Sequence, residues 1–261
     1  MSAGIQKSRD QLHQGEIEFF SKYYESQNYN TVGWDLRLRR ELKSLLRRAG
    51  SQPLGRVLSL GCGDGQFEIM LAQHAEHVTG LDLSPEAIEV ARRKAQQSGC
   101  TNAEFACQPL EDLEWNQTYD TIVVLATLHH VPESELPSMM ATIYKHLTPG
   151  GLFYSQDPNR KGLLRSIGRV VLGKKYDKYH SPDERELDPS NIRATLNSVG
   201  FQDVRIGHID AMLIPGLFMF PRKHTPMMHA FLWFDKVWCS TPLKHWSSGF
   251  NASGRKPKLT A

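Results

Sequence analysis

The chain has 261 residues, 40% of them hydrophobic, and its 31 Lys and Arg exceed its 28 Asp and Glu to leave a formal net charge of +3. This composition is typical of a soluble globular protein and excludes disorder along most of the chain. No stretch approaches the ~18 apolar residues of a membrane-spanning helix, because the longest one, 211–220, contains Pro215 and Gly216.

The N-terminal residues and the cysteines bear on cellular location. Residues 1–15 carry charges and amides without an apolar stretch, so we expect no secretory signal and a cytoplasmic location. The four cysteines, at positions 62, 100, 107 and 239, form no C-x-x-C pair and have no histidine at zinc-finger spacing. We therefore expect reduced thiols and no metal site.

Helices and strands are predicted to alternate after an N-terminal helical segment, 12–49, that ends at Gly50. Short apolar runs predict six strands, at 57–60, 78–81, 103–106, 122–125, 152–155 and 201–209. Helical periodicity marks the segments 67–74, 88–95, 136–147 and 191–199. We leave open a seventh strand within 211–261, where no apolar run is clear enough to place it. This alternation predicts an α/β fold with a doubly wound, Rossmann-like, mostly parallel sheet and helices on both faces.

A glycine-rich turn follows the first predicted strand. It reads Gly61-Cys62-Gly63-Asp64-Gly65 and leads into a helix at Gln66. Such a turn lies at the carboxyl ends of parallel strands, where glycines allow the backbone to approach a ligand closely.

Asp82 ends the second predicted strand, 21 residues after Gly61, as expected for a carboxylate that binds ribose hydroxyls. The alternative is a tight turn followed by an exposed aspartate. The third glycine comes one residue earlier than in the dinucleotide-binding G-x-G-x-x-G motif, which favours a cofactor without phosphates.

At these residues the chain resembles the class I S-adenosylmethionine-dependent methyltransferases of the small-molecule type. The likeness covers about residues 50–210, with 1–49 expected as a helical lid and 211–261 as a basic, aromatic extension that completes the sheet or covers the acceptor site. Five motifs occur in family order, at 57–65, 80–84, 119–124, 128–131 and 147–151.

The resemblance implies S-adenosylmethionine as the cofactor and assigns its contacts. The glycine turn would pass beneath the methionine part, Asp82 would hold the ribose and Leu83 would lie against the adenine. Family members often place an acid after the third strand, where this chain has Gln108, so the Gln108 side chain or a backbone carbonyl is expected to receive the adenine amino group. The implied cofactor-binding residues are Gly61, Cys62, Gly63, Asp64, Gly65, Asp82, Leu83, Gln108, Pro109, Leu110, Leu125, Ala126, Thr127 and Tyr24.

Methyl transfer depends mainly on positioning, but a hydroxyl acceptor also needs a base. His130 is the preferred catalytic candidate and His129 the second, since both follow the fourth strand near the expected acceptor. Alternatively, these histidines only cap the end of the strand. Asp157, after the fifth strand, is a candidate for orienting an acceptor hydroxyl, although turn chemistry explains it equally well.

Basic and aromatic segments bear on the acceptor. Residues 160–178 and 211–261 each hold seven Lys or Arg and one acid, and 162–176 predict an amphipathic basic helix. They favour peripheral contact with a membrane that supplies a lipid-like acceptor, or alternatively a helical cap over a small-molecule pocket.

We expect methyl transfer to an oxygen, and less readily to a nitrogen or carbon, of a small or lipid-like metabolite. The alternatives are a non-catalytic protein that binds S-adenosylmethionine or S-adenosylhomocysteine, and a basic RNA-binding methyltransferase. No DNA partner is expected, because the Asn/Asp-Pro-Pro-aromatic signature is absent after the fourth strand.

Overall fold

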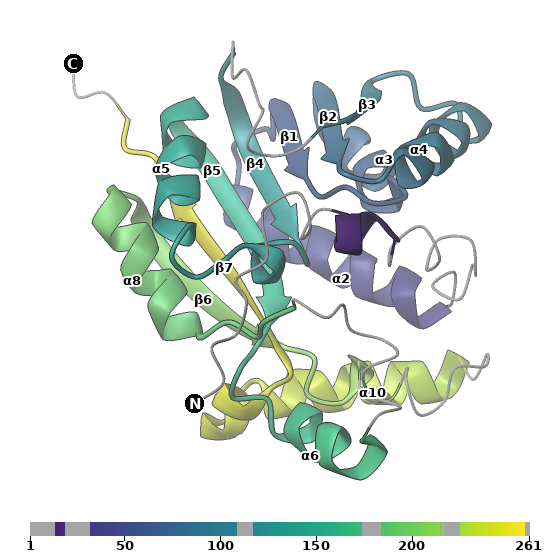
Figure 1. Ribbon diagram of the computed structural model, residues 1–261, viewed down its shortest axis with the longest axis vertical. Helices are drawn as coiled ribbons and strands as arrows, with labels where there is room; N and C mark the ends of the chain where they lie inside the picture. The colour runs from purple at the N-terminus through teal and green to yellow at the C-terminus, as the bar shows by residue number, and fades with distance from the viewer. Residues whose placement is uncertain are drawn as a thin grey trace.

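The computed structural model describes residues 14–18, 32–108, 117–173, 184–214, 216 and 225–258, and the following description concerns these residues. A seven-stranded sheet forms the centre of the molecule, with strand order β3-β2-β1-β4-β5-β7-β6 and helices on both faces (Figure 1). The strands are β1 Arg56–Leu60, β2 His77–Asp82, β3 Ala103–Cys107, β4 Tyr119–Leu125, β5 Leu147–Pro158, β6 Gln202–Ile209 and β7 Gly249–Arg255. The helices are α2 Val32–Ala49, α3 Gln66–Ala72, α4 Pro85–Gln97, η1 Leu128–His130, α5 Leu136–His146, α6 Leu163–Leu172, α8 Pro189–Val199, α10 Thr225–Trp238 and η2 Pro242–Trp246.

The first five strands are parallel to one another, so the predicted doubly wound sheet is confirmed. Alternate residues of β1 enter different cores, because successive side chains of a strand point to opposite faces. Leu58 and Leu60 pack with α5 and α8 on one face, whereas Val57 packs with α2 and α3 on the other. The loops at the carboxyl ends of these buried strands are therefore held in place from both sides.

The seventh strand, which the sequence did not place, is β7. It lies between β5 and β6 and is antiparallel to both. Its sequence is mostly small or polar, yet the strand is buried from Gly249 to Gly254. A Cβ on Gly254 would lie 3.0 Å from Cβ of Phe201, so a small residue is required there. Apolar patterning could not reveal a strand whose neighbours fill the space on both faces.

Helix α2 is fastened to the other end of the chain by buried ion pairs. Nη2 of Arg40 lies 2.5 Å from Asp210, which follows β6, and Nη1 lies 3.2 Å from Asp235 of α10. Arg37 lies 3.4 Å from Asp210. Burial disfavours the charged form of Asp210, but the two arginines outweigh that effect and lower its pKa. These pairs place one face of α2 beside the carboxyl ends of the central strands.

None of the helices within the described ranges is long and apolar enough to cross a membrane.

Candidate functional site

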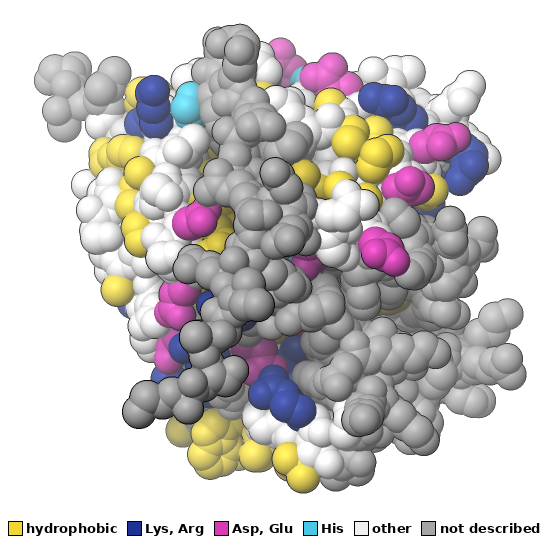
Figure 2. Space-filling model, in the orientation of Figure 1, with side chains coloured by type: hydrophobic (Ala, Val, Ile, Leu, Met, Phe, Trp, Pro, Cys, Tyr) yellow, Lys and Arg dark blue, Asp and Glu magenta, His cyan; other side chains and the backbone are white. Residues whose placement is uncertain are grey.

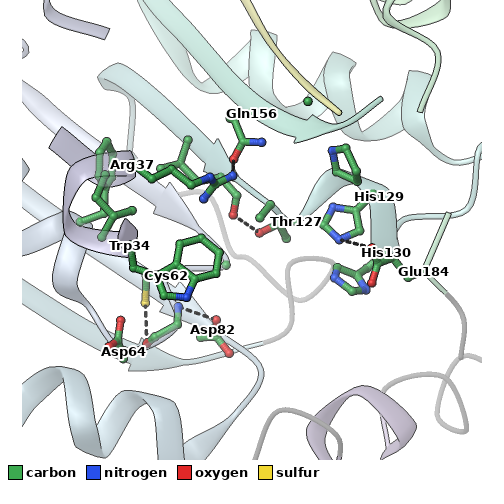
Figure 3. Close-up of a pocket in the computed structure, with 18 of the residues that line it drawn as sticks. Trp34, Arg37, Cys62, Asp64, Asp82, Thr127, His129, His130, Gln156 and Glu184 are labelled. Carbon is green, nitrogen blue, oxygen red and sulfur yellow. Dashed lines mark hydrogen bonds and ion pairs between the residues drawn. The ribbon is translucent and has the colours of Figure 1, made fainter. Parts of the chain in front are cut away.

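A cavity of about 370 Å³ opens at the carboxyl ends of the parallel strands (Figure 3). The loops after β1, β2, β4 and β5 contribute to its walls, and α2 and residues 16–17 contribute from the N-terminal part of the chain. This is the place in a doubly wound sheet where ligands bind. The lining residues include Glu16, Trp34, Arg37, Gly61, Cys62, Gly63, Asp64, Glu68, Asp82, Leu83, Leu125, Ala126, Thr127, His129, His130, Gln156, Arg165, Glu184 and Ser248.

The glycine turn adopts a backbone that side chains would prevent. Gly61, Gly63 and Gly65 have φ values of 73°, 52° and 72°, in the left-handed region. A Cβ on Gly61 would lie 2.0 Å from Oγ1 of Thr127, across the cavity floor. The amides of Gly61 and Cys62 both donate to the carbonyl of Leu81, at 2.8 and 2.9 Å. The turn is therefore drawn against the end of β2 and leaves room for a ligand above it.

The Asp82 carboxylate is fixed in position at the end of β2. Its oxygens accept the amides of Gly63 at 2.8 Å and Ser84 at 3.0 Å (Figure 3 shows the first of these). Ser84 also caps α4, since its hydroxyl accepts the amide of Ala87. Burial raises the pKa of Asp82, while the backbone amides oppose that shift. Each carboxylate oxygen has a further lone pair, so this group is able to accept two hydroxyl donors from a ligand.

The segment after β4 forms the opposite wall. Ala126 has φ 52°, an unusual conformation for a residue with a side chain, and its amide donates to the carbonyl of Gln156 at 2.7 Å. The Thr127 hydroxyl donates to the carbonyl of Leu125 at 3.0 Å. The backbone is thus bent sharply where the wall meets the cavity.

Some predicted contacts lie elsewhere. Gly65 lies beneath the turn, where an added Cβ would meet Ala91 at 2.7 Å, and it is not among the lining residues. The amide of Gln108 donates to the carbonyl of Asp82 at 3.0 Å, and Gln108 is likewise not among the lining residues. Tyr24, Pro109 and Leu110 are outside the described residues.

The two histidines lie at the other end of the cavity, with ring centroids 4.1 Å apart. Nδ1 of the buried His129 is 3.1 Å from Oδ1 of Asp157, which also accepts the His129 amide at 3.2 Å. Nε2 of His129 is 3.8 Å from Glu184, and Nδ1 of His130 is 3.1 Å from Glu16. The two rings therefore line the cavity with carboxylates beside them.

Asp157 is completely buried and lies behind His129. Burial raises the pKa of Asp157 well above its usual value, and the backbone amides of His129 and Leu128 oppose that shift. The expectation that Asp157 meets an acceptor hydroxyl is therefore wrong, because the carboxyl group contacts the imidazole and is shielded from the cavity.

Several lining residues had no signal in the sequence. Arg37 extends from α2 into the cavity and donates to the side-chain oxygen of Gln156 (Figure 3). Glu68, Arg165 and Glu184 also line it. None of them belongs to a local motif, and Arg37 and Gln156 are 119 positions apart in the chain.

The charges of the cavity fit an adenosyl sulfonium better than a dinucleotide. Asp64, Glu68 and Asp82 surround the glycine turn, and Lys94 of α4 pairs with Asp64. Among the described lining residues the arginines are Arg37 and Arg165, and neither belongs to the turn or to α3. A pyrophosphate there would face three carboxyl groups. The described residues contain no cluster of three or more His, Cys, Asp or Glu able to hold a metal ion.

Comparison with known proteins agrees with this geometry. Residues 57–151 match a family described as a methyltransferase domain. The ubiquinone biosynthesis O-methyltransferase of Xylella fastidiosa (strain 9a5c) is 36% identical over 124 residues, covering 46% of this chain and 48% of the relative. The match thus spans about half the length of that relative.

Solved structures share the fold over most of the chain. Magnesium protoporphyrin IX methyltransferase from Synechocystis, with bound S-adenosylhomocysteine, superposes with a TM-score of 0.64 at 19% identity, covering 94% of this chain and 99% of that one. The Haemonchus contortus phosphoethanolamine N-methyltransferase 2 complex with S-adenosylmethionine has a TM-score of 0.65 at 16% identity, covering 99% of this chain and 62% of that one. At these identities the likeness establishes the fold alone.

Proposed function

We propose that this chain, whose residues 57–151 match a methyltransferase domain family, is a class I S-adenosylmethionine-dependent methyltransferase that transfers the methyl group of that cofactor to an oxygen of a small or lipid-like metabolite. The observation that carries the proposal is the Asp82 carboxylate, held by two amides beside the glycine turn and open to the cavity. We propose likewise that residues 1–49 act as a lid over the cofactor-binding domain formed by 50–210. Residues 211–261 would complete the sheet and cover the acceptor site.

The residues that would hold the cofactor lie along one side of the cavity. Asp82 accepts the ribose hydroxyls, Leu83 packs against the adenine, and Gln108 or a backbone carbonyl accepts the adenine amino group. The glycine turn and the segment Leu125, Ala126, Thr127 enclose the methionine part. Arg37, whose guanidinium enters the cavity from α2, suits the methionine carboxylate. When bound, the cofactor supplies an electrophilic methyl group.

His129 is better placed than His130 to act as the base. Asp157 holds Nδ1 of His129, which leaves Nε2 directed toward the cavity, where Glu184 lies 3.8 Å away (Figure 3). A carboxyl group behind an imidazole fixes both its orientation and its tautomer. Nε2 then receives the proton of an acceptor hydroxyl as the oxygen attacks. His130 remains the second candidate, beside Glu16.

The acceptor class follows from this base and from the curated relatives. An imidazole base suits a phenolic hydroxyl, because its proton must be removed as the methyl group is transferred. The relatives named for ubiquinone biosynthesis are O-methyltransferases. We therefore propose an aromatic hydroxyl on a lipid-like or small acceptor.

A methyl-transfer assay tests the proposed function. The protein is incubated with labelled S-adenosylmethionine and catechol-type phenols, with and without a prenyl tail, and S-adenosylhomocysteine is quantified. We expect turnover that depends on the phenol and falls to background in Asp82→Ala. Tight cofactor binding with no transfer to any phenol would favour a non-catalytic binding protein. RNA binding that weakens steeply with salt would favour an RNA methyltransferase.

The partner surface we propose is the apolar edge, seven exposed hydrophobic residues on three helices. Its residues are Leu163, Ile167 and Val170 of α6, Trp233 and Val237 of α10, and Leu243 and Trp246 of η2. These are the large hydrophobic side chains that are exposed among the residues whose burial the structure describes. Figure 2 shows hydrophobic side chains gathered at the lower end of the molecule, where Figure 1 labels α6.

Charge and position favour an anionic lipid surface as the partner of the apolar edge. The acid of these three helices, Asp235, is 4% exposed, whereas Lys236 is exposed, and the exposed Arg169 is paired with Glu186. Apolar burial and attraction to anionic headgroups together bind proteins at a membrane surface. Arg165 of α6 and Ser248, which follows η2, line the cavity. A lipid-like acceptor would therefore enter the cavity from the membrane side.

Liposome flotation tests this contact. We expect the protein to float with vesicles that contain phosphatidylglycerol at low salt, and to bind less at high salt. The double variant Ile167→Glu, Val170→Glu should bind about tenfold more weakly, because it loses apolar burial and adds repulsion. Ser138→Glu, Ala141→Glu on the exposed side of α5 adds the same charge as a control. Equal flotation of the two double variants, or none by the wild type, would contradict the contact.

A further inference from the structure

Glu68 is a buried carboxyl group that the proposed contacts do not use. It lies in the first turn of α3 and faces β1, where the Ser59 hydroxyl donates to its Oε1 at 2.6 Å. The residue is 2% exposed and lines the cavity. Its Oε2 is buried and has no hydrogen-bond partner among the described residues.

A buried oxygen without a donor is costly to the fold. Leaving such a group unsatisfied costs about 1–3 kcal/mol, and more when it carries charge. Proteins retain such groups where a ligand supplies the missing partner. Glu68 therefore indicates a position in the cavity wall where a ligand could supply a hydrogen-bond donor.

The neighbours of Glu68 favour a positively charged donor. Asp64 and Asp82 add negative charge, and the nearby Cys62 thiol is buried and has a raised pKa. Burial raises the pKa of Glu68 to about 8, against the opposing effect of the Ser59 hydroxyl. The group is thus mostly protonated near neutral pH while the cavity holds no cation, and a bound cation would favour its ionised form.

Strand order indicates which part of the cofactor lies there. β1, which carries Ser59, pairs with β2 on one side and β4 on the other. Glu68 is therefore attached to the strand between Asp82 at the end of β2 and Leu125 at the end of β4. The methionine part is expected above this strand. Its sulfonium has no hydrogen to donate and its carboxylate would be repelled, which leaves the ammonium group.

We propose that the Glu68 carboxylate receives the α-ammonium group of S-adenosylmethionine and loses its own proton to solvent when the cofactor binds. This inference rests on the proposed function and adds to it a second anionic contact and a linkage to pH. The neutral carboxyl group gives up one proton, becomes a carboxylate and accepts an N–H of the ammonium. The ammonium group keeps its three protons.

The sign of the pH dependence follows from this exchange. The cofactor binds the ionised form of Glu68, whose pKa before binding is about 8. Below that pH a proton must leave, so the affinity should rise with pH by up to about tenfold per unit between roughly pH 6 and 8. Asp64 and Asp82 face the same site, and their negative charge keeps the Glu68 proton in place until the cation arrives.

Titration calorimetry at pH 6.5, in two buffers of different ionisation enthalpy, measures the proton. The free cofactor ammonium is fully charged at that pH and does not contribute. We expect the wild type to release close to one proton for each S-adenosylhomocysteine bound. Glu68→Gln should release none and bind S-adenosylhomocysteine about 10- to 100-fold more weakly. Methylthioadenosine, which lacks the amino-acid part, should bind both proteins equally.

Controls separate the possible failures. Glu104→Gln removes an exposed acid on β3 and should behave as the wild type. Normal S-adenosylhomocysteine binding by the wild type without proton release, or unchanged affinity in Glu68→Gln, would overturn the role of Glu68 alone. If Glu68→Gln is too unstable to bind methylthioadenosine, proton release by the wild type still decides the matter. A wild type that binds neither compound would overturn the proposed function itself.

Discussion

Asp82→Asn is expected to weaken S-adenosylhomocysteine binding by about 100-fold or more, because two hydroxyl-to-carboxylate hydrogen bonds contribute about 1.5–3 kcal/mol each. Asparagine keeps the size of the side chain but offers one oxygen where the structure uses both. Those oxygens already accept the amides of Gly63 and Ser84, so the variant also loosens the glycine turn. Asp82→Ala should lose at least as much. Titration calorimetry measures the change directly.

Asp203→Asn is the matched control for this experiment. Asp203 is a half-exposed aspartate on β6 whose charge is paired with Arg205, and it lies outside the cavity. Its replacement should leave cofactor affinity within about twofold of the wild type, since surface changes have small effects. Cofactor affinity that is equal in Asp82→Asn and Asp203→Asn would contradict the ribose contact and, with it, the orientation of the cofactor.

His129→Gln should lower kcat by about 10²–10⁴-fold while cofactor affinity changes little, as expected when a general base is removed. Asp157→Asn should also lower kcat, because the carboxyl group that fixes the orientation and tautomer of His129 is lost. Single-turnover methyl transfer at saturating cofactor, followed across pH, isolates the chemical step. The pH profile of kcat in Asp157→Asn should shift relative to the wild type, because the amide that replaces the carboxyl group cannot share a proton with the His129 imidazole.

His130→Gln is the informative comparison, because the two rings are neighbours and either could face an acceptor. Nδ1 of each ring lies 3.1 Å from a carboxylate, Glu16 for His130 and Asp157 for His129, but Asp157 is completely buried and also accepts the His129 amide. We therefore expect a smaller loss of kcat than in His129→Gln. A larger loss of kcat in His130→Gln than in His129→Gln would restore the preference for His130 drawn from the sequence. Wild-type kcat in His129→Gln, Asp157→Asn and His130→Gln would remove both histidines from the chemistry.

The sequence allowed the parallel part of the sheet to be predicted because most of its strands contain short apolar runs, as in 57–60 and 122–125. Local spacing was equally informative for the glycine turn and for the capping residue Ser84, since each depends on neighbours a few positions away. β7 could not be predicted, because its small and polar residues carry no apolar period. The same holds for contacts between distant segments, such as Arg37 with Asp210 and His129 with Asp157.

The role of Glu68 illustrates this limit most clearly. By sequence alone it is an ordinary acid in the first turn of a helix, where it would be expected to face water and interact with the helix dipole. Only the packing of α3 against β1 reveals that Ser59 occupies one oxygen and that the other is left in the cavity wall. A buried carboxyl group of this kind arises from tertiary structure, which residue spacing does not encode.

The position of β7 has a consequence for synthesis on the ribosome. β5 and β6 are made well before residues 249–255, yet neither can pair with β7 until that segment has left the exit tunnel. Until then, the nascent polypeptide displays the open side of β5, and such edges invite pairing with other chains. A nonsense codon upstream of position 249 would make this exposure permanent, so the resulting fragments should be prone to precipitate or to be captured by chaperones.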